Sequence, residues 1–355
     1  MQGLHTLLVR DPETGATPSC DTGNEYDGRM GLRISSIFVI MVGSMLGAVF
    51  PVIARNFGAG NSKLLRRCFF VAKFFGSGVI TATAFIHLLG PAEEALKNEC
   101  LTGPITEYSW VEGIILMTIV VMFFVELMVM RYARFGQSHV HGLEHDDHAH
   151  QSLDNSSGAV EPKSHIPGED HLGHSREHRD TELGGKMSAT EDYAAQLTSV
   201  FILEFGIIFH SIFIGLTLAV SGEEFITLYI VLVFHQTFEG LGLGSRLATT
   251  PWPASKRWTP YVLGLSYGLS TPIAIAIGLG VRNSYPPEGY TTLIVNGVFD
   301  SISAGILIYT ALVELMAHEF MFSPSMRRAP IGTVLAAFGL LCLGAALMAL
   351  LGKWA

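Results

Sequence analysis

The sequence predicts an all-α membrane protein, a polytopic chain with eight transmembrane helices. Of its 355 residues 49% are hydrophobic and 15% are charged, whereas a soluble chain typically has about 25% charged residues. Apolar runs recur along the chain at about 20 residues, the length needed to cross the hydrocarbon core of a bilayer. Because backbone groups cannot stay unpaired in lipid, such runs must be helices. These features, with a net charge of −9, disfavour a soluble enzyme, a disordered scaffold and a nucleic-acid-binding protein.

Eight hydrophobic segments follow one another, and none alternates polar with apolar residues as a transmembrane strand would. The residues before the first segment lack the basic start and short apolar core of a cleaved signal peptide, so we expect that segment to remain as a span. The predicted spans are Ile34–Ala54, Phe69–Leu89, Val111–Met130, Leu197–Val220, Phe225–Gly244, Tyr261–Val281, Leu293–Met316 and Ile331–Leu351.

The positions of lysine and arginine predict the orientation, because cytoplasmic loops are enriched in both. Most of the 22 basic residues, Arg246 among them, follow the first, third, fifth and seventh spans. This places both termini outside the cell, although Arg29 and Arg33 lie against the rule. Lys73, inside the second span, is expected to extend its amine toward the interface.

We divide the chain into four parts on this basis. Residues 1–33 form an extracellular acidic tail, and residues 34–135 hold the first three helices. Residues 136–192 form a disordered cytoplasmic loop, since they have too few large apolar residues to offset the entropy of ordering. Residues 193–355 hold the last five helices and the candidate metal site.

The cytoplasmic loop contains most of the histidines, interspersed with acidic residues. Histidine-rich tracts bind metals such as zinc, although a purely polar linker would have a similar composition. The loop histidines are His139, His141, His145, His148, His150, His165, His171, His174 and His178.

Two spans carry histidine and carboxylate at bilayer depth, where each ionisable group costs at least a few kcal/mol. The fourth span reads HSIFIGL from His210, and the fifth reads HQTFEGLGLGSR from His235. His235 and Glu239 are four residues apart and therefore share a helix face. Two imidazoles and one carboxylate from neighbouring helices would bind Zn²⁺, and Ser211 or Gln236 could complete its coordination. The alternative is that His210 and His235 only hydrogen-bond between helices.

Further polar residues have weaker signals. Glu204 lies six residues before His210, on a different face, and is a candidate supporting group. His87 is near the predicted outer end of the second span and is a candidate on the entrance path, or an interfacial histidine that meets water. Asp300 could act at a metal gate, or as an anion at the start of the seventh span. Glu314 is an intramembrane acid without an evident partner.

The signature segments of the fourth and fifth spans resemble the ZIP (Zrt-/Irt-like) metal-ion transporters. TATAFIHLLGPAEEAL, STPIAIAIGLG and FDSISAGILIYTALVELMAHEF further resemble the fungal plasma-membrane zinc-uptake branch, and the likeness covers all but the histidine-rich loop and the extreme N-terminus. The resemblance implies a ZIP-type bundle in the plasma membrane that moves divalent metal into the cytosol. It places the transport site at His210, Ser211, His235, Gln236 and Glu239.

The resemblance also has limits. Some relatives carry an acid where this chain has Ile214, and another where it has Thr271, so we expect one principal metal. Zn²⁺ is the expected transported substrate, and no cofactor is expected. Fe²⁺, Mn²⁺ or Cd²⁺ would suit the same ligands. The family also suggests that Lys163 or Lys186 receives ubiquitin from a ligase, and a homodimer is a further candidate assembly.

Three other functions fit parts of the pattern. A metal exporter of the cation-diffusion type also has histidine-rich loops, but typically has six helices and an HxxxD pair. An intramembrane metalloprotease would need a motif such as HExxH, which is missing from the sequence. A membrane metal sensor would bind at the same residues without flux.

Two of the four cysteines, Cys20 and Cys100, fall on the predicted outer side, where disulfides persist. A bridge between them and a pair of free thiols both remain open.

Overall fold

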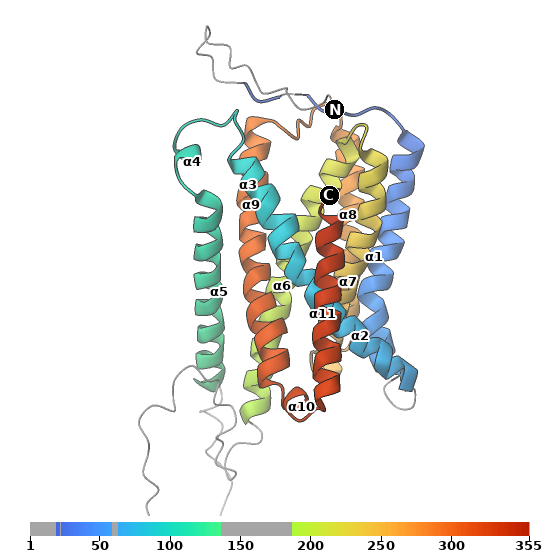
Figure 1. Ribbon diagram of the computed structural model, residues 1–355, viewed down its shortest axis with the longest axis vertical. Coiled ribbons are helices and arrows are strands. Elements are labelled where there is room, and N and C mark those ends of the chain that lie inside the picture. The colour runs from blue at the N-terminus through green and yellow to red at the C-terminus, as the bar shows by residue number, and fades with distance from the viewer. Residues whose placement is uncertain (1–18, 22, 59–62, 136–186, 355) are drawn as a thin grey trace, which may run out of the picture. The chain divides into compact units, whose positions relative to one another are not determined.

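The computed structural model describes residues 19–21, 23–58, 63–135 and 187–354. The nine loop histidines lie outside these residues, as do Lys163 and Lys186. The described chain is helical throughout its regular structure, and Figure 1 labels the helices. They are α1 (Met30–Gly58), α2 (Lys63–Ala82), η1 (Thr83–Leu89), α3 (Gly90–Leu96), α4 (Pro104–Glu107), α5 (Trp110–Phe135), α6 (Met187–Val220), α7 (Phe225–Thr249), η2 (Ala254–Lys256), α8 (Thr259–Val281), α9 (Tyr290–Tyr309), η3 (Thr310–Phe322), α10 (Pro324–Arg327) and α11 (Ile331–Leu351).

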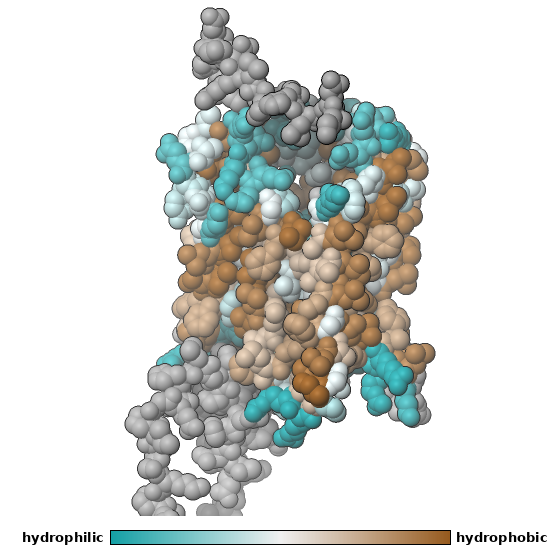
Figure 2. All heavy atoms as spheres, in the orientation of Figure 1, coloured by the Kyte–Doolittle hydropathy of each residue, from teal (hydrophilic) through white to brown (hydrophobic). Residues whose placement is uncertain are grey.

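Eight helical stretches in the described residues are long and apolar enough to cross a membrane, which confirms the predicted fold class and span number. Five of them are longer than predicted, the second and the seventh most of all. The second continues through the π-helical η1 into α3 and covers Lys63–Leu96, and the seventh joins α9 to the π-helical η3 and covers Tyr290–Phe322. Figure 2 shows hydrophobic side chains gathered across the middle of the visible face, with hydrophilic ones toward its ends.

The chain forms two compact units. One comprises residues 1–124 and 199–355, and contains every candidate site residue of the transmembrane part. The other, residues 125–198, contains the end of α5 and the start of α6. Within the first unit α7 packs against α1 and α2, while α2 packs against α11 and α9 packs against α3.

Glycines allow the helices around α7 to approach closely. A Cβ added at Gly240 would lie 2.9 Å from the carbonyl oxygen of Ser44 on α1, and one at Gly242 would lie 2.8 Å from that of Gly76 on α2. Such contacts leave no room for a methyl group. The small residues that follow the candidate ligands along α7 thus bring two further backbones against it.

The N-terminal segment before α1 connects several helix ends. A disulfide joins Cys20 to Cys100, with their Cα atoms 4.9 Å apart. Asn24 donates from Nδ2 to the carbonyl oxygens of Arg282, at 2.5 Å, and Tyr285, at 3.0 Å. The segment therefore connects the loop after α3 with the end of α8.

Arg33 is fully buried, which explains why it departs from the charge rule. Its guanidinium pairs with Asp27 at 2.7 Å and donates to the carbonyl oxygens of Leu218, Ala219 and Ser221. A residue used to bind the end of α6 in this way is a structural cation rather than a topology signal.

Two other charged residues have partners on helices that are distant in the sequence. Lys73 pairs with Glu319 at 2.5 Å, with 23% of its side chain exposed. Arg246, counted from the sequence as a loop residue, lies inside α7 and pairs with Glu314 at 2.6 Å, so that Glu314 has a partner after all. Both pairs join helices that are distant in the sequence, and spacing along the chain does not predict them.

Candidate metal centre

Three side chains of the signature segments converge in the first unit. His210 comes from α6, and His235 and Glu239 come from adjacent turns of α7. Each offers one ligand atom, and these atoms all lie within 4.8 Å of one another. His235 Nε2 is 3.8 Å from Glu239 Oε2, and the rings of the two histidines have centroids 5.6 Å apart.

These separations suit a metal site that closes on its ion. Ligand atoms placed tetrahedrally at about 2.0–2.1 Å from Zn²⁺ would be roughly 3.4 Å apart. A bound ion would therefore draw the three side chains together by small movements. Because two of them stand on α7 and one on α6, that closure couples the two helices.

The centre is buried and its polar atoms are unpaired. His235 and Glu239 are fully buried, and His210 is 3% exposed. Among the described residues, neither nitrogen of His235, neither carboxylate oxygen of Glu239, nor Nε2 of His210 has a hydrogen-bond partner. Buried polar groups are usually satisfied, so this cluster of free lone pairs indicates a place for a cation. It also disfavours histidines that merely bond between helices.

Ser211 and Gln236 lie beside the ligands and share their burial. Both are fully buried, and Ser211 Oγ and both amide atoms of Gln236 lack partners in the described part of the chain. Tyr267 on α8 donates its hydroxyl proton to the backbone carbonyl of Gln236 at 2.6 Å. That bond holds the α7 backbone between the two α7 ligands.

Asp300 belongs to this centre, and its expected alternative role at a helix start was wrong. The helix α9 begins ten residues earlier, at Tyr290. Asp300 Oδ1 lies 3.9 Å from His210 Nδ1 and has no hydrogen-bond partner within the described residues. Asp300 is 8% exposed, more than the three ligand candidates.

His87 also lies at the centre rather than at an interface. It is 5% exposed, and its ring meets that of His235 edge to face, with centroids 4.6 Å apart. Its Nε2 is 2.9 Å from the carbonyl oxygen of Met348 on α11. If Nε2 carries the proton and donates to that carbonyl, Nδ1 keeps its lone pair.

The remaining sequence candidates are not among the three converging side chains. Glu204 on α6 is 3% exposed, and both of its carboxylate oxygens are unpaired among the described residues. Thr271 is fully buried with an unpaired Oγ1, and Ile214 packs in an apolar cluster with Ile40 and Leu218. The positions where some relatives carry acids thus offer a hydroxyl and an alkyl group.

The sequence indicated the three candidate ligands that the structure brings together, but not the residues that surround them. The proximity of His87 and Asp300 to the centre depends on helices that cross at the same depth, and spacing within one helix does not reveal it. A usable signal was present for both: each is an ionisable residue within a stretch of apolar sequence.

Comparison with known proteins places the chain among transporters. The family model described as ZIP Zinc transporter matches residues 30–352. Zinc-regulated transporter 2 of Saccharomyces cerevisiae is 42% identical, with 98% of this chain and 99% of the relative covered. Zinc-regulated transporter 1 of the same yeast is 43% identical over 94% and 90% of the two chains. Zinc-regulated transporter 1 of Schizosaccharomyces pombe is 40% identical over 98% and 92%.

Proposed function

Because this chain belongs to the ZIP zinc transporter family, whose members are transporters and not enzymes, we propose that it takes up Zn²⁺ through the site formed by His210, His235 and Glu239. The observation that carries the proposal is the meeting of these three ligand atoms within 4.8 Å, buried and unpaired. Similarity to zinc-regulated transporters over nearly the whole chain supports zinc as the substrate.

The site residues would have separate roles. Asp300, the most exposed of them, attracts the arriving cation, and the two imidazoles and one carboxylate then replace water in its coordination shell. Ser211 and Gln236 offer further oxygen atoms. Having three ligands from the protein leaves a position open, which speeds exchange, and a transporter must release what it binds.

The membrane potential favours inward transport. Where the potential is negative inside, inward movement of a divalent cation is favoured by about 4.6 kcal/mol per 100 mV, twice the single-charge value. We also propose that both termini lie outside the cell. The plasma membrane is the proposed location. The histidine-rich loop would receive the ion in the cytoplasm, where Lys163 or Lys186 could accept ubiquitin. A homodimer is also proposed.

The experiment is zinc uptake by vesicles containing the purified full-length chain. Glu239→Ala and His235→Ala should each abolish measurable uptake, because each removes a ligand from a site with three. Glu93→Gln is the matched control, since Glu93 is an acid at the membrane edge whose side chain is 37% exposed. Uptake that survives both ligand substitutions would remove the assignment.

The same vesicles test the alternatives. Net efflux against the imposed gradient would indicate an exporter of the cation-diffusion type. Zinc binding without flux would indicate a sensor. Competition by Fe²⁺, Mn²⁺ and Cd²⁺ would establish selectivity, because imidazole with carboxylate suits several divalent ions.

A further inference from the structure

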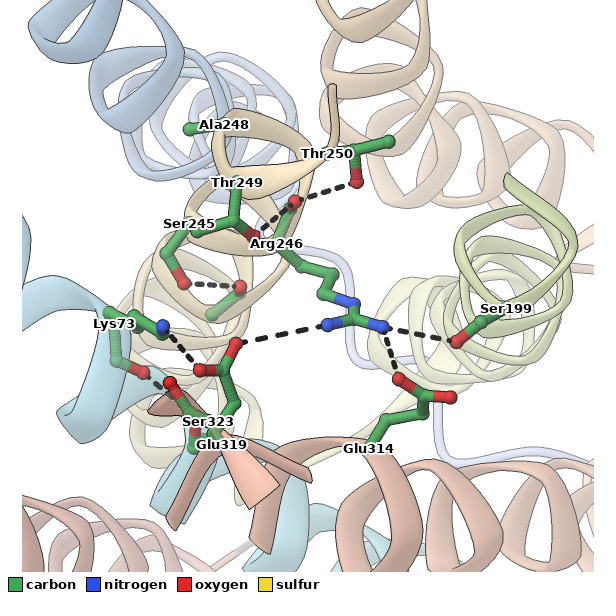
Figure 3. Close-up of polar contacts among 12 residues, drawn as sticks. Lys73, Ser199, Ser245, Arg246, Ala248, Thr249, Thr250, Glu314, Glu319 and Ser323 are labelled. Atoms are coloured by element: carbon green, nitrogen blue, oxygen red, sulfur yellow. Dashed lines mark hydrogen bonds and ion pairs between the residues drawn. The ribbon is translucent and has the colours of Figure 1, made fainter. Parts of the chain in front are cut away.

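A second group of charged residues lies near the C-terminal end of α7, beyond the two candidate ligands on that helix. Arg246 on α7 is 7% exposed and donates from one guanidinium nitrogen to Glu314 at 2.6 Å and to Ser199 of α6 at 3.4 Å (Figure 3). Its other terminal nitrogen is 4.0 Å from Glu319, which pairs with Lys73 of α2 at 2.5 Å. One guanidinium thus joins α6, α7 and η3, and reaches α2 through Glu319.

The position of Arg246 relates this group to the metal centre. Arg246 follows Glu239 by seven residues, two turns of α7, so both side chains leave the same face about 10 Å apart. In the proposed orientation Arg246 is on the cytoplasmic side, three residues before α7 ends at Thr249. An ion released inward from Glu239 along this face would approach the guanidinium.

Glu204 lies between the two groups along α6. It is five residues beyond Ser199, which contacts Arg246, and six before His210. Glu204 is only 3% exposed, and neither of its carboxylate oxygens has a hydrogen-bond partner among the described residues. An unpaired buried carboxylate in this place would bind Zn²⁺ that has left the three ligands while Arg246 still blocks the route.

The π-helical form of η3 brings the two acids to the same cation. Glu314 and Glu319 are five residues apart, and a π-helix repeats its hydrogen bonds at i to i+5. Both acids therefore face the Arg246 side of η3, where an α-helix would turn them apart. Their side chains are each 13% exposed.

We propose that Arg246 closes the cytoplasmic end of the metal route, and that its ion pair with Glu314 must separate before Zn²⁺ can leave. A guanidinium repels a cation, and while it is bonded to Glu314 it also occupies the carboxylate that could attract one. When the pair separates and the guanidinium moves away from the route, its repulsion of the ion falls with distance and Glu314 is free to attract the ion on the exit side. Lys73 keeps Glu319 paired meanwhile, which limits the charge exposed. This inference rests on the proposed transport site and adds a gating residue to it.

The experiment measures access to the centre without using metal. A reporter cysteine replaces Ser211 in a full-length chain that also carries Cys68→Ser and Cys342→Ser; these two are the free cysteines of the described chain, while Cys20 and Cys100 are bonded to each other. A membrane-impermeant thiol reagent is applied to the cytoplasmic face in inside-out vesicles. Arg246→Gln should raise the labelling rate about tenfold, the change in the closed–open balance that corresponds to about 1.4 kcal/mol.

Three further variants make the result specific. Glu314→Gln breaks the same pair from the other side and should raise labelling similarly, which keeps the test valid if Arg246→Gln does not fold. Arg246→Glu combined with Glu314→Arg should return the rate toward that of the parent. Lys97→Gln removes an ion pair with Glu93 that is exposed on the outer side, and should leave the rate unchanged.

The outcomes are distinct from those of the uptake assay. Equal labelling of the parent, Arg246→Gln and Glu314→Gln would overturn the gate, and so would a charge-exchanged variant that labels as fast as Arg246→Gln. Failure of the parent chain to take up zinc would overturn the proposed function, while the labelling result would still report whether Arg246 closes the route.

Discussion

The imidazole of His87 stands edge to face against the imidazole of His235, with ring centroids 4.6 Å apart. This contact connects η1 to a fully buried candidate ligand on α7. Since Nε2 of His87 is held at the carbonyl of Met348, α11 also helps to set the position of the His235 ring. A metal centre on two helices is therefore positioned by two more.

Replacing His87 should weaken zinc binding, although His87 is not one of the three proposed ligands. We expect His87→Ala to lower zinc affinity about tenfold, the lower end of the effect of removing a group that orients a metal ligand. Titration calorimetry of the purified chain would measure it. His87→Phe keeps a ring against His235 and should lose less. Equal affinity for the parent and His87→Ala would show that the contact does not position the ligand.

Arg33, the buried cation at the end of α6, should contribute strongly to the stability of the protein. Arg33→Gln removes a buried guanidinium that donates to Asp27 and to backbone carbonyl oxygens, and should cost about 1.5–3 kcal/mol, seen as a lower melting temperature in detergent. Arg29→Gln is the matched control, because Arg29 pairs with the same Asp27 while 35% exposed; its cost should be about 1 kcal/mol or less. Similar melting of both variants would contradict the structural role of Arg33.

The disulfide closes a long stretch of chain, since Cys20 and Cys100 are separated by 80 positions. Cys20→Ser should destabilise the protein by about 2–4 kcal/mol, mainly by freeing the unfolded chain. Melting with and without reductant would measure this: the reductant should lower the melting temperature of the parent and leave Cys20→Ser unaffected. Cys342→Ser, at an exposed free thiol, should behave as the parent. A parent indifferent to reductant would argue against the bridge.

The close helix approach at α7 predicts which glycines tolerate a methyl group. Gly242→Ala would place its Cβ 2.8 Å from the carbonyl oxygen of Gly76, and should cost about 1–3 kcal/mol through overpacking. Gly339→Ala on α11 has open space around the added atom and should cost little. Thermal melting of the two variants in one detergent would compare them. Equal melting temperatures would mean that α7 and α2 can separate without cost.

The sequence alone predicted the eight spans, and it singled out His210, His235 and Glu239, whose side chains meet in the structure. The reason is physical: hydrocarbon tolerates so few ionisable groups that each one inside an apolar run is conspicuous, and the spacing of His235 and Glu239 within one helix gives their common face directly. The predicted spans needed corrections only at their ends, the largest being in the second span, which continues into α3, and in the seventh, which continues through η3.

Only the tertiary structure decided which distant residues share that depth. Arg246 contacts Glu314, Arg33 contacts backbone carbonyls at the end of α6, and His87 contacts His235; each of these contacts joins different helices. Such contacts depend on how each helix is rotated and how far it is shifted along its neighbour, and on the π-helical turns that change that rotation. Hydropathy sets the length and number of helices, but it does not encode these rotations and shifts.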